Sequence, residues 1–423
     1  MRHCSKCGGP IYTDELFCFA CGAPAEMLEI VSDDEIDPED EVRKERFQDA
    51  LDCKDAEALF ELGIEYSEDE SFSYKCMKES ARLGNIDAVR VLGDYCILGR
   101  GITKDEKTGF ELLTSAANLD NEIAQAHLGD LYRLGKGVEQ DFKKALMWYK
   151  RAAGNGCAKA QYSIGVMYEK GEATPQSYST AAFWYEQAAD QGYERAQFVL
   201  GVLYITGKGV DEDVDKALDL FEKAADSGLS YAQSVLGIYY FEGRYVEQDY
   251  SKALGYFEAA ADQGDASSQF HLGLMYYNGI EVPENSAVAA EWYQRAAEQG
   301  HMEAQLLLGT QYDFGDGVPE DKALAAEWTE KAAEQGHVEA QCIIGTIYLS
   351  GEGVPQDYAK AAMWYEKAAE QGDDNAQYYI AMMYYRGMGV EKDLEKAVMW
   401  ARKSADQDNE MAKKLLKKMG FDT

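Results

Sequence analysis

Four of the nine cysteines lie close to the N-terminus and have the spacing of metal ligands. Cys4 and Cys7 are separated by two residues, and Cys18 and Cys21 repeat that spacing after an interval of ten residues. A Cys-x-x-Cys-Gly turn directs two thiolates at one point, and two such turns complete a tetrahedral site for zinc. Four thiolates leave no open coordination position, so the pattern predicts one structural zinc ion and not a catalytic one.

The sequence around these cysteines agrees with a structural metal site. A redox-active Cys-x-x-Cys pair would need a βαβ context, which this segment lacks, and His3 is interpreted as an accidental neighbour. With its Phe-Cys and Gly-Ala-Pro flanks, the segment resembles the short zinc ribbon found at the N-termini of prokaryotic proteins. We therefore expect a zinc ribbon over residues 1–26. Residues 27–41, MLEIVSDDEIDPEDE, hold eight acidic and no basic residues, which is typical of a solvated linker.

A period of 36 residues organises most of the chain. Glycine recurs at residues 93, 129, 165, 201, 237, 273, 309 and 345, and Ala381 takes the equivalent place in the last repeat. The nine repeats begin at residues 85, 121, 157, 193, 229, 265, 301, 337 and 373. A fixed period of this length is the signature of a solenoid, in which stacked repeats share one core. Each repeat is named below by its first residue, and its positions are numbered 1 to 36.

Each repeat contains the pattern of two helices. In repeat 337, Ala340, Ile344 and Tyr348 recur at helical spacing, and the Ala, Trp and Tyr residues of AKAAMWYEKAA form a second such pattern. The GEGVPQD segment between them carries the glycines and the aspartate expected of a helix stop, a loop and a new N-cap. The repeat is therefore predicted to be an antiparallel helix hairpin. Aromatic residues at positions 12, 28 and 29 face Ala and Gly in this pattern, which indicates core packing and not an aromatic binding site.

The run A-x-x-x-L-G-x-x-Y, then G-x-G-V-x-x-D, then K-A-x-x-W-Y-x-x-A-A-x-x-G, resembles the Sel-one-like repeat, a relative of the tetratricopeptide repeat. The resemblance covers residues 85–408 and implies an all-α superhelical α/α solenoid that binds proteins and catalyses no reaction. Residues 42–84 are expected to form an N-terminal capping helix and a shortened repeat, and residues 409–423 a C-terminal capping helix.

Composition limits the classes of partner. The formal net charge is −35, which argues against nucleic acid or an anionic membrane as the main partner. The N-terminus has no apolar signal segment, and no later stretch has the length of a membrane span. The five other cysteines are scattered, which indicates reduced thiols. We expect a cytoplasmic monomer.

The sequence offers little for catalysis. A β-lactamase-like hydrolase would need an S-x-x-K nucleophile, which is absent, and the K-T-G at residues 107–109 falls inside a predicted helix. The histidines occupy equivalent repeat positions and do not converge, and no phosphate-binding loop follows a strand. We therefore predict that the protein is not an enzyme.

By analogy with tetratricopeptide repeats, positions 3, 6, 10, 13 and 14 of the first helices are expected to line a concave groove. Eight acids and six bases occupy these positions over the nine repeats, so the lining is predicted to be nearly neutral: Asp87, Asp94, Asp130, Glu169, Glu242, Glu303, Asp313 and Glu339 against Arg90, Arg133, Lys159, Lys170, Arg195 and Arg386. Residues 157–300 put an excess of apolar side chains there. The predicted partner-binding residues are Tyr162, Phe198, Ile205, Phe241, Phe270 and Tyr277, with Phe241 and Tyr277 at position 13 least expected to be core.

Together these patterns predict a non-catalytic protein-interaction scaffold that captures a partner peptide or helix in the groove, with one structural zinc ion. The alternative is a nucleic-acid- or ribosome-associated adaptor acting through the zinc ribbon. Against it, residues 1–26 carry only Arg2 and Lys6 as bases, beside three acids.

Overall fold

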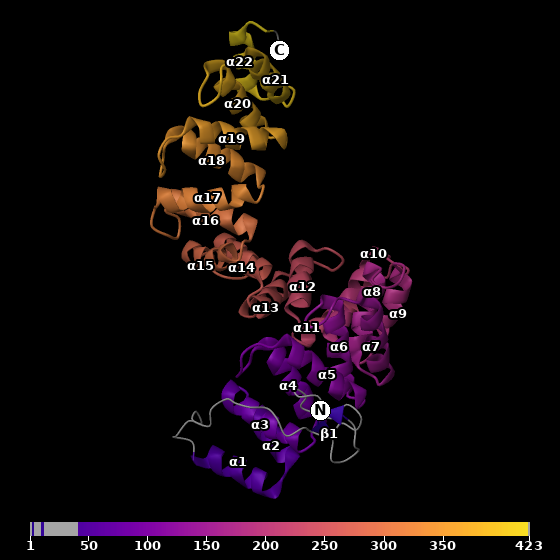
Figure 1. Ribbon diagram of the computed structural model, residues 1–423. Helices are drawn as coiled ribbons and strands as arrows, with labels where there is room; N and C mark the ends of the chain where they lie inside the picture. The colour runs from indigo at the N-terminus through magenta and orange to yellow at the C-terminus, as the bar shows by residue number, and fades with distance from the viewer. Residues whose placement is uncertain (1, 4–9, 12–40, 422–423) are drawn as a thin grey trace. The chain divides into compact units, whose positions relative to one another are not determined.

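A computed structural model of the 423-residue chain describes residues 2–3, 10–11 and 41–421. In this part the fold is an all-α solenoid of 22 helices, as the repeat pattern predicted, together with one pair of two-residue strands (Figure 1). The strands β1 (Arg2–His3) and β2 (Pro10–Ile11) are antiparallel, with Arg2 opposite Ile11. The predicted zinc ligands and the acidic segment 27–40 lie outside the described residues.

The chain divides into two compact units, residues 1–224 and 225–423, which we call the N-terminal and C-terminal units. The N-terminal unit holds ten complete helices: α1 (Glu41–Cys53), α2 (Ala56–Glu65), α3 (Glu70–Arg82), α4 (Ile86–Leu98), α5 (Glu106–Asn118), α6 (Glu122–Leu134), α7 (Phe142–Gly154), α8 (Ala158–Lys170), α9 (Tyr178–Ala189) and α10 (Glu194–Thr206). The boundary between the units falls within α11 (Val214–Asp226).

The C-terminal unit continues the same alternation of first and second helices. Its complete helices are α12 (Ser230–Glu242), α13 (Tyr250–Asp262), α14 (Ala266–Asn278), α15 (Ser286–Glu298), α16 (Met302–Phe314), α17 (Lys322–Glu334), α18 (Val338–Ser350), α19 (Tyr358–Glu370), α20 (Asp374–Arg386), α21 (Leu394–Ala405) and α22 (Glu410–Met419).

Short polar side chains and glycines set the helix ends. In repeat 337, His337 caps α18 by accepting from the Ala340 N–H, and Asp357 caps α19 by accepting from the N–H groups of Ala359 and Lys360. These bonds satisfy donors that the first turn of a helix leaves unpaired. Gly351 ends α18 in the left-handed conformation, which glycine adopts without steric cost.

A contact between glycine and an aromatic ring joins the two helices of a hairpin. The ring at position 29 of the second helix lies against the glycine at position 9 of the first, as with Tyr365 on Gly345 and Tyr293 on Gly273. A Cβ added to Gly273 would lie 2.4 Å from Cε1 of Tyr293, so only glycine admits the ring. In repeat 373 both positions are occupied by alanine (Ala381 and Ala401), so the two sites change together.

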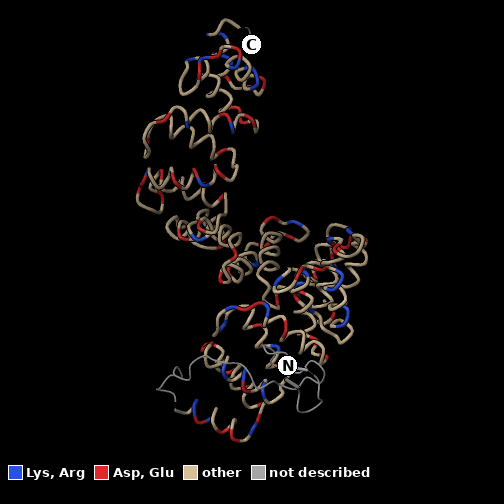
Figure 2. The backbone as a smooth tube through the Cα atoms, in the orientation of Figure 1, with Lys and Arg blue, Asp and Glu red and all other residues tan. Residues whose placement is uncertain are grey.

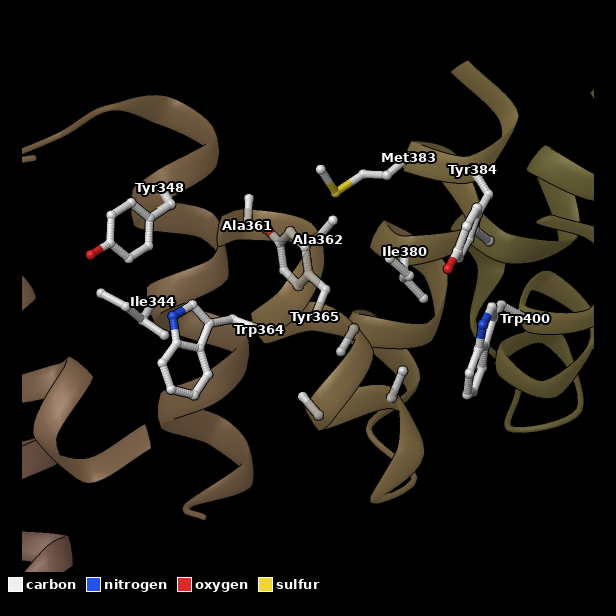
Figure 3. Packing of buried hydrophobic residues seen from close by; sticks show 14 of the residues in the cluster. Ile344, Tyr348, Ala361, Ala362, Trp364, Tyr365, Ile380, Met383, Tyr384 and Trp400 are labelled. Atoms are coloured by element: carbon white, nitrogen blue, oxygen red, sulfur yellow. The ribbon is translucent and has the colours of Figure 1, made fainter. Parts of the chain in front are cut away.

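The core continues from repeat to repeat. Figure 3 shows side chains of repeats 337 and 373 in one buried cluster, including Ile344, Tyr365, Ile380 and Tyr384. Trp364 is also buried there, and Lys367 lies over its ring with Nζ 4.0 Å from the ring centroid. The expected role of the position-28 tryptophans in packing is therefore confirmed at Trp364.

Buried glutamine side chains at position 5 form a feature that the sequence analysis did not anticipate. Gln341 donates from Nε2 to the carbonyl of Ala333 in the preceding repeat (3.1 Å), and its Oε1 accepts from Nε2 of Gln371 (2.8 Å). Gln371 also donates to the Gly336 carbonyl at 3.3 Å. Similar bonds recur at Gln305 and Gln377, so a row of amides connects successive repeats within the C-terminal unit.

Three loops between the helices of a hairpin depart from the others in one backbone feature. Position 17 has a positive φ in every repeat, and in six repeats it is glycine. Ala173, Tyr245 and Glu281 occupy this position with φ between 59° and 66°. These three loops therefore hold a side chain where the other repeats use glycine, at some cost in backbone strain.

Candidate partner-binding surface

The first-helix surface comprises the residues at positions 3, 6, 10, 13 and 14 of the first helices. The predicted region 157–300 crosses the boundary after Ala224, so each unit carries its own part of this surface.

In the N-terminal unit, the three predicted binding residues are half-buried. The ring of Tyr162 packs against those of Tyr185 and Tyr193, with centroids 5.5 and 5.3 Å away. Phe198 similarly lies 5.5 Å from Phe221. These rings serve packing within and between repeats, and only part of each is available to a partner.

In the C-terminal unit, Phe241 belongs to a cluster of rings. Its centroid lies 5.3 Å from Tyr250, 5.8 Å from His271 and 6.2 Å from Phe257, and the residue is half-buried. Phe241 thus contributes to packing more than its position 13 had suggested. The sequence could not show this, because the neighbouring rings come from two further helices.

Phe270 packs within the same group of rings. Its ring stacks on His301 with centroids 4.5 Å apart, while His271 stacks on Phe257 at 4.7 Å. Nδ1 of His271 lies 2.8 Å from the Ser267 carbonyl, which can only accept, so this nitrogen carries the proton. Burial lowers the pKa of both His271 and His301, although Glu303 and Asp265 oppose this effect at His301. Both rings are therefore predominantly neutral at pH 7.

Tyr277 is the most accessible of the six predicted residues, with 41% of its surface exposed. The nearby carboxylate of Asp316 raises the pKa of Tyr277. Asp316 lies two residues beyond Phe314, the last residue of α16. The influence of Asp316 therefore places the Tyr277 side chain of α14 near the end of the next first helix.

Phe314 was missed by the sequence analysis, although 74% of it is exposed, the largest fraction among the exposed large hydrophobic residues that the structure describes. It occupies position 14 of repeat 301, just beyond the segment in which the apolar excess was counted. Including this repeat would have identified it.

Figure 2 marks the charged residues along the backbone. The charges of the first-helix surface differ between the units. In the N-terminal unit this surface has four acids and five bases: Asp87, Asp94, Asp130 and Glu169 with Arg90, Arg133, Lys159, Lys170 and Arg195. The C-terminal unit has four acids and one base: Glu242, Glu303, Asp313 and Glu339 with Arg386. The near-neutral lining predicted for the whole array is therefore an average over two different surfaces.

Ion pairs neutralise much of the N-terminal unit's surface. Lys159 reaches Asp130 of the preceding repeat at 2.9 Å, and Arg90 lies 3.3 Å from Asp94. In the C-terminal unit, Asp313 is paired with Lys322 at 3.1 Å. Within the described part of that unit, Glu242, Glu303 and Glu339 form no ion pair with lysine or arginine.

Two further features were sought in the described part of the chain, a metal-binding group and a membrane-spanning helix. Among the described residues, no group of three or more His, Cys, Asp or Glu side chains is arranged to hold a metal ion. No helix in this part of the chain is both long and apolar enough to cross a membrane. Cys4, Cys7, Cys18 and Cys21 lie outside the described residues, so the zinc site stays a prediction.

Comparison with known proteins agrees with this architecture. The Sel1 repeat model matches ten segments: residues 56–85, 86–121, 123–157, 158–193, 194–229, 230–265, 266–301, 303–337, 338–373 and 374–409. The first segment falls in the shortened repeat. No curated protein matches this chain.

Two bacterial structures are similar over most of their length. The protective antigen c5321 of uropathogenic Escherichia coli is 30% identical, over 89% of this chain and 90% of that chain, with a TM-score of 0.53. A Sel1 repeat protein from Oxalobacter formigenes is 34% identical, over 82% of this chain and 89% of that chain, with a TM-score of 0.48. On the repeat matches and the identity to the c5321 antigen, the chain belongs to the Sel1 repeat family.

Proposed function

We propose that this protein is a non-catalytic interaction scaffold, and that the first-helix surface of the C-terminal unit binds a partner peptide or helix. The observation that carries the proposal is the pair of exposed rings Tyr277 and Phe314, which lie on consecutive first helices; Asp316, whose carboxylate acts on Tyr277, follows Phe314 by two residues. Aromatic side chains that are exposed together often become the centre of a protein interface. Half-buried Phe270 lies on the same helix as Tyr277 and would extend the contact.

The solenoid gives such a surface a rigid frame. The position-9 glycines and the amide row fix each first helix against its neighbours, so Tyr277 and Phe314 need little ordering when a partner binds. Rigid aromatic side chains make binding stronger by reducing the entropy lost on association. The fold class agrees with this role, since Sel1 and tetratricopeptide repeats are typical of protein-interaction scaffolds.

A pair of matched double variants tests this proposal. Tyr277→Ser with Phe314→Ser removes the proposed contact, and Met363→Ser with Met399→Ser removes two exposed apolar residues, each 42% exposed, from second helices. We expect both variants to keep wild-type helical circular dichroism, and only the first to lose the proteins that the full-length chain captures from cell extract. Equal capture by the wild type and both variants would refute the proposed surface.

We also propose that Cys4, Cys7, Cys18 and Cys21 bind one structural zinc ion. The support is the donor set alone, because four thiolates at this spacing match the tetrahedral preference of zinc and leave no position for substrate. The zinc would order the N-terminal segment and take no part in a reaction.

A further inference from the structure

The uncompensated acids of the C-terminal unit indicate the chemistry of its partner. Glu242, Glu303, Asp313 and Glu339 come from three of the four consecutive repeats 229 to 337, whose first-helix surface positions include no lysine or arginine. Asp313 has Lys322 as a partner, but the three glutamates have no such cation among the described residues. A surface with one sign of charge attracts segments of the opposite sign and raises their rate of association.

Charge alone does not make a binding site, and here the acids lie among apolar rings. Tyr277 and Phe314 belong to repeats 265 and 301, and Glu242 and Glu339 belong to the repeats on either side. A segment that crosses this surface would therefore meet rings in the middle and carboxylates around them. Such a segment needs both basic and apolar side chains.

A buried hydroxyl supplies a second, independent observation. Tyr293 is 1% exposed, and its hydroxyl has no hydrogen-bond partner in the described part of the chain. Leaving such a group unpaired costs about 1–3 kcal/mol.

The equivalent tyrosines find partners on the first-helix surface. The hydroxyl of Tyr149 donates to Asp130 at 2.6 Å, and that of Tyr365 lies 2.9 Å from the Thr346 hydroxyl. Asp130 and Thr346 both occupy position 10, whereas repeat 265 has Leu274 there. The Tyr293 hydroxyl thus points to the same surface but lacks an acceptor from its own repeat.

We propose that the first-helix surface of repeats 229 to 337 binds a basic peptide segment that carries apolar side chains. This inference rests on the proposed function and specifies its partner. Lysine or arginine side chains of the peptide pair with Glu242, Glu303 and Glu339, and its apolar side chains contact Tyr277 and Phe314. A small shift of Leu274 lets a backbone carbonyl of the peptide accept from the Tyr293 hydroxyl.

Four short synthetic peptides serve as probes for the full-length protein: alternating Lys–Leu, Glu–Leu, Gln–Leu and Lys–Gly sequences. We expect the Lys–Leu peptide to bind most tightly in a fluorescence anisotropy titration, and its affinity to fall as salt rises. Replacing Glu242, Glu303 and Glu339 together by Gln should weaken the binding of the Lys–Leu peptide about tenfold. Each exposed ion pair between a glutamate and a peptide lysine contributes about 0.2–1 kcal/mol to binding.

The control for net charge is a triple Gln variant at Glu298, Glu334 and Glu370. These exposed acids end the second helices α15, α17 and α19, so the charge change is identical. We expect the control to bind like the wild type. Equal weakening in both triple variants would show a general charge effect and overturn the inference.

Tyr293→Phe removes only the hydroxyl. It should weaken the binding of the Lys–Leu peptide by about 2- to 10-fold without lowering the thermal stability of the protein.

The experiment distinguishes failure of the basic-partner inference from failure of the proposed function. If Gln–Leu binds as tightly as Lys–Leu and both depend on Tyr277 and Phe314, the basic-partner inference is wrong while the surface stands. If the binding of none of the peptides depends on Tyr277 and Phe314, both proposals are wrong.

Discussion

Replacing glycine by alanine should have opposite effects at two helical sites of the C-terminal unit, Gly273 and Gly255. Both lie inside helices, α14 and α13 respectively, so alanine gains about 1 kcal/mol of helix propensity at each site. Around Gly255, apart from its two chain neighbours and the backbone of its own helix, no described atom lies within 4 Å of an added Cβ. Gly255→Ala should therefore raise the free energy of unfolding by about 1 kcal/mol.

At Gly273 the added methyl group meets a buried ring. Its Cβ would lie 2.4 and 2.5 Å from two carbons of Tyr293, whereas carbon atoms in contact are about 3.5–4.0 Å apart. The ring must move by roughly 1 Å, but Tyr293 is enclosed, and overpacking of this kind costs about 1–3 kcal/mol. With a cost near the upper end of that range, offset in part by the gain in helix propensity, Gly273→Ala should lower the free energy of unfolding by about 2 kcal/mol. The free energies of unfolding of the two variants should therefore differ by about 3 kcal/mol.

Urea denaturation followed by circular dichroism measures the difference, and hydrogen exchange locates it. Because contacts in a solenoid are between neighbours, faster exchange should be confined to α14, α15 and the adjoining helices. A double-mutant cycle with Tyr293→Ala should show a favourable coupling energy of about 1–2 kcal/mol, as the alanine pair of repeat 373 implies. If Gly273→Ala stabilises the protein as much as Gly255→Ala, the proposed role of glycine at position 9 is wrong.

Three further predictions concern the amide row, pH and zinc. Gln341→Met keeps the side-chain volume but removes the buried hydrogen bonds of Gln341. It should lower the free energy of unfolding, measured by urea denaturation, by about 1–3 kcal/mol. An unchanged urea midpoint would contradict this. Burial lowers the pKa of His271 and His301 below the ordinary value of 6.5, so the unfolded chain binds protons more readily than the folded chain. The contribution of these two histidines to the free energy of unfolding is therefore fully present above pH 6.5 and is lost as the pH falls below it. His271→Phe should flatten this dependence, and a urea midpoint that does not change with pH would exclude the effect. Replacing all four N-terminal cysteines by serine should remove one equivalent of zinc in metal analysis and leave the melting of the solenoid unchanged.

The hairpins could be predicted because their determinants recur. A 36-residue register identifies position 9 as glycine, position 12 as tyrosine and position 25 as alanine, and each type follows from close helix packing. The glutamine at position 5 recurs almost as often, in eight of the nine repeats, but a polar residue type does not by itself indicate a buried site. A buried amide requires partners from two other segments, Ala333 and Gln371 in the case of Gln341, and one repeat alone does not show them.

Individual surface residues were harder to predict, because equivalent positions have different neighbours. Phe241 and Tyr277 share position 13, but Phe241 packs beside His271 of the next repeat, whereas Tyr277 is followed by a repeat that offers Asp316. Exposure at this position therefore depends on the residue one repeat later. A repeat consensus averages out this information.

The charge of the first-helix surface follows the same reasoning. Counting over nine repeats gave near neutrality, although five of the six bases precede residue 225 and half of the acids follow it. A bound peptide spans only a few repeats, and screening limits the reach of exposed charges to about 8–10 Å, so it experiences the local excess and not the total. For a solenoid, partner chemistry should therefore be inferred over a window of a few repeats, and in this chain repeats 229 to 337 form the window in which exposed rings and uncompensated acids coincide.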